Sequence, residues 1–81
     1  MILIDYFGHM VATESEMELH IFARKIGLKR EWFQNSGRFP HYDLTTKRKI
    51  NQALAAGAKQ VPIRDIVTKA WWARLASIID N

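Results

Sequence analysis

The residues of this sequence best suited to chemistry are His41 and Asp43, which lie two positions apart in the segment PHYDLTTKRK. On an extended backbone, residues two apart project to the same face, so the imidazole and the carboxylate would be neighbours. A carboxylate beside a histidine fixes its tautomer and makes it a better base. We therefore predict His41 as a general base and Asp43 as the residue that orients it.

A run of three cations, residues 47–49, follows directly at the predicted start of a helix that Thr45 or Thr46 caps. Cations are unfavourable at this end because the helix dipole places partial positive charge there. Backbone N–H groups, hydroxyls and cations together suit an anion, phosphate above all. We expect Lys47 and Arg48 to hold a phosphate; the alternative is that the basic run is simply solvated.

Other polar residues are predicted near this segment. His20 lies in a helical row with Glu16 and Arg24, four positions apart, which favours ion pairing on an exposed flank. Asp5 and His9 lie near the end of the first predicted strand, where active-site residues of α/β proteins often emerge. No pair of these residues has compact metal-ligand spacing, so we expect neither a metal nor a cofactor.

Composition indicates one small globular domain. The 81 residues are 48% hydrophobic and 25% charged, and the absence of cysteine excludes disulfides and thiolate zinc sites. No apolar stretch approaches the ~20 residues of a membrane span, so we expect a cytoplasmic protein without a membrane partner. The formal charge is +4, and residues 24–49 hold eight Lys or Arg against two acidic residues, a net +6. Such a patch favours anionic partners, nucleotide or nucleic acid first.

The periodicities predict the order strand, helix, extended segment, helix, strand, helix, and hence a small single-domain α/β fold over residues 1–81. ILIDYF before Gly8 is typical of a strand, and Thr13 with Glu16 predicts a capping box for the first helix. Gly27 and Gly57 are the expected stops of the first two helices. A mostly α fold with vestigial strands is the alternative.

The last strand and helix are predicted from a shorter stretch of sequence. KQVPI predicts a brief edge strand because Pro62 cannot donate to a ladder. Asp65 is the expected cap of the last helix, in which Trp71 belongs to the apolar stripe. Trp72, adjacent to it, cannot face the same core and is predicted as an interface residue. Trp32 is expected to anchor the core rather than to stack on a ligand.

A helix-turn-helix is a second interpretation of residues 22–37, FARKIGLKREWFQNSG, with Gly27 in the turn. In that case the cations would contact DNA phosphates and the amides would contact adenine edges. The second helix would be only about two turns long before Gly37 ends it. The predicted DNA-binding residues of this alternative are Arg24, Lys25, Lys29, Arg30, Gln34 and Asn35.

The segments GHMVATESEMELHIFARKIGL, WFQ, HYDLTTKRK and ALAAGAKQV together resemble the domain of unknown function 4031, a family of small proteins encoded by bacteria and their phages. The resemblance spans about residues 2–63 and leaves residues 64–81 as a helical extension. It implies no established activity. It does imply that His20, Gln34, His41 and Asp43 belong to the family's signature, which favours a site over plain surface and adds His20 to the predicted site.

The favoured hypothesis is a polar pocket beside a basic helix start that binds a phosphate-bearing ligand such as a nucleotide or nucleic acid. Whether it also acts on that ligand, by acid–base cleavage or transfer, stays open. Two alternatives remain: helix-turn-helix-like DNA binding through residues 20–36, and a phage-type protein-interaction module that uses the C-terminal helix, through which the chain could also self-associate. The predicted catalytic residues are His41, Asp43 and His20, and the predicted ligand-binding residues are Asp5, His9, Gln34, Lys47 and Arg48.

Overall fold

The computed structural model describes residues 1–35 and 40–69, which form a small α/β domain. The elements in chain order are β1 (Ile2–Ile4), β2 (His9–Ala12), α1 (Glu16–Lys25), the 3-10 turn η1 (Arg30–Trp32), β3 (Phe33–Gln34), β4 (His41–Asp43), α2 (Lys47–Ala55), β5 (Lys59–Gln60) and α3 (Ile63–Lys69). Within this described part, no helix is both long enough and apolar enough to cross a bilayer.

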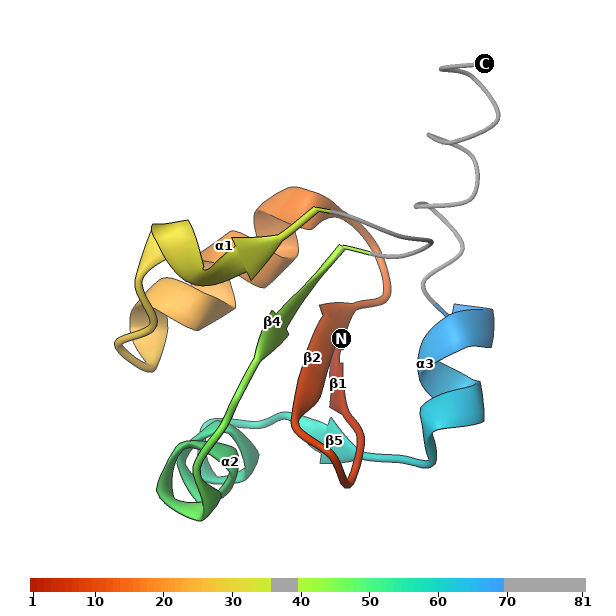
Figure 1. Cartoon of the computed structure of the whole chain (residues 1–81). Coiled ribbons are helices and arrows are strands. Elements are labelled where there is room, and N and C mark those ends of the chain that lie inside the picture. The colour runs from red at the N-terminus through yellow and green to blue at the C-terminus, as the bar shows by residue number, and fades with distance from the viewer. Residues whose placement is uncertain (36–39, 70–81) are drawn as a thin grey trace.

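The strands form one mixed sheet in the order β3-β4-β2-β1-β5 (Figure 1). The pairs β1/β2, β2/β4 and β3/β4 are antiparallel, whereas β5 runs parallel to β1 at the edge. The predicted α/β class and the edge position of KQVPI are therefore confirmed. Strand β2 was not predicted, because the four residues HMVA are too short to show a clear period of two.

Helices cover both sides of the sheet, with α1 and α2 on one side and α3 on the other (Figure 1). Side chains alternate along β1 and β2, so Ile4 and Met10 face α1, whereas Leu3 and Val11 face α3. We call these two sides the α1 face and the α3 face. Each fully buried side chain of Leu or Ile size contributes roughly 1.5–3 kcal/mol.

Two apolar clusters follow from this alternation. On the α1 face the core contains Ile2, Ile4, Met10, Ala12, Leu19, Ala23, Ile26, Leu28, Tyr42, Leu44, Ala53 and Ala58. On the α3 face a smaller cluster contains Leu3, Val11, Val61 and Ile66. Among the described residues, the α3 face therefore has less apolar packing, and polar side chains occupy part of it.

The helix boundaries correct two predicted caps. Ser15 rather than Thr13 caps α1, since its hydroxyl accepts the backbone N–H of Glu18 at 3.1 Å. Asp65 lies inside the first turn of α3, where its charge complements the helix dipole, and it is not the cap. Thr46 is confirmed as the cap of α2. Gly27 follows the end of α1 with φ 79°, as expected of a stop residue.

The segment after α1 does not form the second helix of a helix-turn-helix. Residues 30–32 make a single 3-10 turn, and Phe33–Gln34 pair with β4 as a strand. A recognition helix needs several turns, so this prediction was wrong. Trp32 is 43% exposed and not a core anchor. The predicted interface residue Trp72 lies outside the described residues.

Candidate functional site

A buried carboxylate in the turn between β1 and β2 holds the ring of His9. Asp5 is 0% exposed, and its Oδ1 accepts the backbone N–H groups of Phe7 at 2.8 Å and His9 at 3.0 Å. Its Oδ2 lies 2.7 Å from His9 Nδ1. An ionised carboxylate only accepts, so Nδ1 carries the hydrogen and the neutral ring presents an unprotonated Nε2. The turn therefore fixes both the tautomer and the orientation of His9.

Gly8 allows this turn to approach the end of β4. Its φ is 96°, a conformation that favours glycine, and a Cβ at this position would lie 2.2 Å from the Leu44 carbonyl oxygen. The Leu44 N–H donates to the Gly8 carbonyl oxygen at 2.8 Å. A side chain at Gly8 would therefore push His9 away from β4.

The register of the sheet places a second His and Asp beside His9. Asp43 is the partner of His9 across β2 and β4, and His41 projects to the same face from two residues earlier. Asp43 Oδ1 lies 3.4 Å from His41 Nε2 and 3.7 Å from His9 Nε2. The two rings meet edge to face with centroids 5.5 Å apart. Asp5, His9, His41 and Asp43 thus form one group on the α3 face, which we call the His/Asp cluster.

Gln34 joins this face through strand pairing. It is the partner of His41 across β3 and β4 and therefore projects to the same side. Five of the predicted site residues are brought to one face by contact or register. The expected pairing changes in one respect: the short carboxylate contact is Asp5 to His9, whereas Asp43 lies farther from His41.

His20 lies on the opposite side, on the α1 face. Its Nδ1 is 2.8 Å from the Tyr42 hydroxyl, and its Nε2 is 3.1 Å from Glu16 Oε2. The ring also packs edge on against Phe33, with centroids 4.5 Å apart. Both ring nitrogens are engaged, and the predicted contact with Glu16 is present. The structure does not bring His20 to the His/Asp cluster.

Tyr42 connects this α1-face network to the core. It is 1% exposed and alternates along β4 with His41 and Asp43, so its ring points toward α1. Burial raises the pKa of the Tyr42 hydroxyl above its ordinary 10.0; the positive charge of Arg30 opposes the rise and the carboxylate of Glu16 adds to it. The hydroxyl therefore stays protonated and paired with His20.

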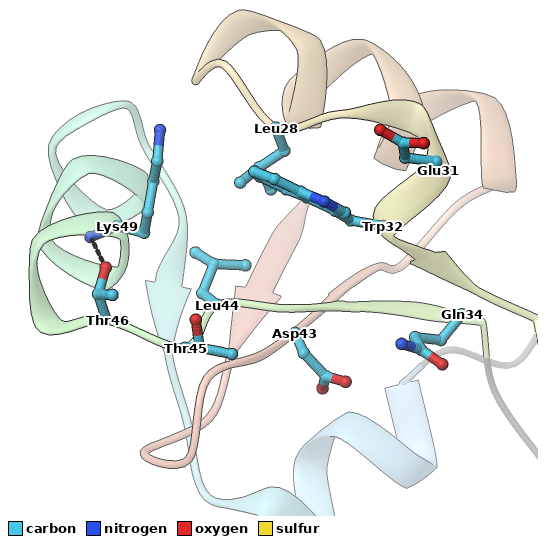
Figure 2. A pocket seen from close by; sticks show the side chains of 9 residues that line it. All are labelled: Leu28, Glu31, Trp32, Gln34, Asp43, Leu44, Thr45, Thr46 and Lys49. Carbon is cyan, nitrogen blue, oxygen red and sulfur yellow. Dashed lines mark hydrogen bonds between the residues drawn. The ribbon is translucent and has the colours of Figure 1, made fainter.

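A cavity of about 510 Å³ lies between the chain at 28–32 and the chain at 43–49 (Figure 2). Its volume is typical of small-molecule sites, which span roughly 300–1,000 Å³. The exposed ring of Trp32 lies on one side of it, and Asp43 belongs both to its wall and to the His/Asp cluster. The lining residues are Leu28, Glu31, Trp32, Gln34, Asp43, Leu44, Thr45, Thr46 and Lys49.

Of the basic run at the start of α2, Lys49 is the residue that lines this cavity. Its Nζ donates to the Ile26 carbonyl oxygen at 3.1 Å, which ties α2 to the end of α1. Lys47 and Arg48 are exposed and line none of the cavity wall. The first turn of α2 contains no acidic residue, in contrast to α1. The helix start is therefore positive, and its charge reaches the cavity through Lys49.

The predicted DNA-binding residues are Arg24, Lys25, Lys29, Arg30, Gln34 and Asn35. They come from the end of a helix, a turn and the edge of the sheet, and all six are exposed. Two of the cations lie over aromatic rings: Lys29 Nζ is 5.7 Å from the Trp32 ring centroid, and the Arg30 guanidinium is 5.0 Å from that of Phe33. Such cations flatten against the surface and do not project from a recognition helix.

Sequence reasoning did not select Trp32 and Lys49 as site residues. For Lys49 the signal was present, because it is the third cation of the same run, three residues after the cap. For Trp32 no local pattern distinguishes a buried ring from an exposed one. Among the described residues, no group of three His, Asp or Glu side chains has a geometry that could hold a metal ion.

A sequence model for a family described as a protein of unknown function, DUF4031, matches residues 4–73. The match begins just before Asp5 and extends through all of α3, ten residues beyond the predicted limit at residue 63. No curated protein and no solved structure matches the chain.

Proposed function

The chain belongs to the DUF4031 family, and from the side chains that its fold brings together we propose that it binds a phosphate-bearing ligand of the nucleotide type. One observation carries this proposal. Asp43 is shared by the His/Asp cluster and by a cavity whose other walls bear an exposed indole and a lysine. His9 and His41 do not line the cavity themselves, so Asp43 is the residue that connects a ligand in the cavity with the two imidazoles.

The cavity offers the groups that a nucleotide needs. The ring of Trp32, a residue that is 43% exposed, gives a platform for a base, and base–aromatic stacking contributes roughly 1–3 kcal/mol. Lys49 and the hydroxyl of Thr45 line the side toward the start of α2, where the helix dipole favours phosphate. Glu31 and Asp43 oppose an anion, so phosphate is best placed near the helix start.

The His/Asp cluster gives the bound ligand acid–base groups. His9 is held by Asp5 with Nε2 directed toward Asp43, which is the arrangement that a general base requires. We therefore assign the role of general base to His9, whose ring Asp5 orients, with His41 as its neighbour. His20 has no role in ligand binding in this proposal.

Isothermal titration calorimetry with AMP, ATP and adenosine tests the proposal. We expect both nucleotides to bind more tightly than adenosine, because only they carry phosphate. Trp32→Ala and Lys49→Gln should each weaken AMP binding about tenfold, as expected from lost stacking and a lost charge-assisted contact. Lys59→Gln, on the far edge of the sheet at β5, is the matched control and should change nothing.

Two results would contradict the proposal. One is that none of the three compounds, AMP, ATP and adenosine, binds to the protein. The other is binding that responds equally to the substitutions at Lys49 and Lys59, which would indicate attraction to the overall positive charge only.

A further inference from the structure

The His/Asp cluster contains two imidazoles aimed at one point. Their Nε2 atoms lie 3.7 Å and 3.4 Å from the same oxygen, Asp43 Oδ1, so they cannot be farther apart than these two distances combined. Asp43 Oδ1 therefore marks a position that both Nε2 atoms face. In a displacement at phosphorus, the base must come within hydrogen-bond reach of the attacking oxygen and the acid within reach of the leaving oxygen.

The two rings are held in different ways. His9 has its Nδ1 fixed by the fully buried Asp5, so its neutral form presents a lone pair on Nε2. His41 lies on the adjacent strand, with Nε2 facing Asp43 Oδ1, to which a protonated ring can donate. One histidine is thus set as a base, and the other can serve as the acid. Asp5, which acts through His9, is a positioning residue.

The two carboxylates also differ in how firmly they are held. Asp5 is anchored by three hydrogen bonds inside the turn. The side chain of Asp43 is 42% exposed at the rim of the cavity, and its contacts to both rings exceed the usual hydrogen-bond distance. The scissile phosphate of a polynucleotide, distinct from a phosphate held near the start of α2, can therefore displace the Asp43 carboxylate by rotation of its side chain, whereas Asp5 stays in place.

Two opposed imidazoles need a nucleophile from elsewhere. The chain has no cysteine, and Ser15 and Thr46 are committed to capping α1 and α2. The hydroxyl of Thr45, which lines the cavity, is assigned to phosphate binding in the proposed function. A substrate with its own hydroxyl beside the phosphate removes this need, and the 2′-hydroxyl of RNA is in that position. The net charge of +4, concentrated in residues 24–49, suits a polyanion.

We propose that this protein cleaves single-stranded RNA by transesterification, with His9 as base and His41 as acid; this inference rests on the proposed phosphate-ligand function. His9 Nε2 takes the proton of the 2′-hydroxyl, and the 2′-oxygen forms a bond to phosphorus. The bond from phosphorus to the 5′-oxygen breaks, and protonated His41 gives its proton to that oxygen. The products are a 2′,3′-cyclic phosphate and a 5′-hydroxyl, with no oxidant or other co-reactant consumed.

The test uses the full chain and two fluorescent oligonucleotides of one sequence, an RNA strand and its 2′-O-methyl analogue, both in EDTA. The analogue lacks the attacking hydroxyl, so its fluorescence anisotropy measures binding alone. Gel electrophoresis and mass spectrometry of the RNA measure cleavage and identify the cyclic phosphate end. We expect binding of both strands and cleavage of RNA only.

Three variants assign the roles. His9→Asn and His41→Asn should each lower the cleavage rate ~100-fold or more, the usual contribution of a general acid or base. Both should still bind the 2′-O-methyl strand within about threefold, which shows that the fold and the binding surface persist. His20→Asn is the matched control, since it removes an imidazole from the α1 face, and it should cleave RNA within twofold of the parent protein.

The outcomes separate the two proposals. Binding of the 2′-O-methyl strand without cleavage of RNA would overturn this inference and leave the proposed phosphate-ligand function standing. Failure to bind either strand, or AMP, would overturn both. Cleavage that persists in His9→Asn and His41→Asn would also overturn the two-histidine assignment. So would cleavage that is seen only when EDTA is left out, because it would indicate a metal ion.

Discussion

The two faces of the sheet use the same kinds of side chain to opposite effect. On the α1 face, both ring nitrogens of His20 are engaged, by Tyr42 at 2.8 Å and Glu16 at 3.1 Å. On the α3 face, His9 has one nitrogen held at 2.7 Å by Asp5, while the other faces Asp43 at 3.7 Å, beyond a normal hydrogen bond. A histidine with both nitrogens engaged stabilises the fold, whereas one held by a single nitrogen can act on a ligand.

The largest effect that this comparison predicts is at Asp5. Asp5→Leu removes a fully buried carboxylate and leaves the N–H groups of Phe7 and His9 without their acceptor, and we expect a loss of about 3–5 kcal/mol in the free energy of unfolding. Urea denaturation measures this. Asp43→Leu, at the exposed rim, is the control and should cost less than about 1 kcal/mol. Equal losses of unfolding free energy for the two variants would contradict the conclusion that Asp5 is held firmly and Asp43 is not.

The next largest effect is expected at Gly8. Gly8→Ala forces a Cβ to within 2.2 Å of the Leu44 oxygen at a φ of 96°, and we expect a loss of about 3 kcal/mol. Gly57 has a similar φ of 118° but nothing within 4 Å, so Gly57→Ala isolates the conformational cost of about 1 kcal/mol. Thermal denaturation compares the two. Similar losses of stability in Gly8→Ala and Gly57→Ala would mean that the close approach of the turn to β4 adds no steric cost at Gly8.

The smallest effect concerns Tyr42 on the α1 face. Tyr42→Phe removes the hydroxyl bonded to His20 and should cost about 1 kcal/mol at neutral pH. Because burial raises the pKa of Tyr42 above 10.0, the native state keeps this proton when the unfolded state loses it. The free energy of unfolding should therefore fall as pH rises above 10, less steeply in Tyr42→Phe. Identical slopes for parent and variant from pH 9 to 11 would contradict the buried assignment.

Sequence predicts those contacts of this site that lie within a single strand or helix, and it fails for contacts between separate elements. The shared face of His41 and Asp43 follows from the alternation of one strand, and the contact of Glu16 with His20 follows from the spacing of one helix. Both were predicted correctly. The pairing of His9 with Asp5 needs the β1–β2 turn, and the short segment HMVA did not identify its second strand.

Contacts between distant segments were beyond sequence reasoning. The hydroxyl of Tyr42 reaches His20 across 22 positions, and the Lys49 amine reaches the Ile26 carbonyl across 23. These pairings depend on how α1, β4 and α2 pack, which no local periodicity encodes. The same limit explains why Trp32 was predicted in the core: an indole of this size suits either a core or a ligand platform.

Side-chain NMR of the three histidines tests most directly whether the His/Asp cluster responds to a ligand bound in the adjoining cavity. Imidazole ¹H–¹⁵N correlation spectra would be recorded during a titration with AMP, with signals assigned by the single His→Asn variants. We expect chemical-shift changes at His9 and His41 and none at His20, which keeps its bonds to Tyr42 and Glu16. Shifts confined to His20, or none at saturating AMP, would contradict it.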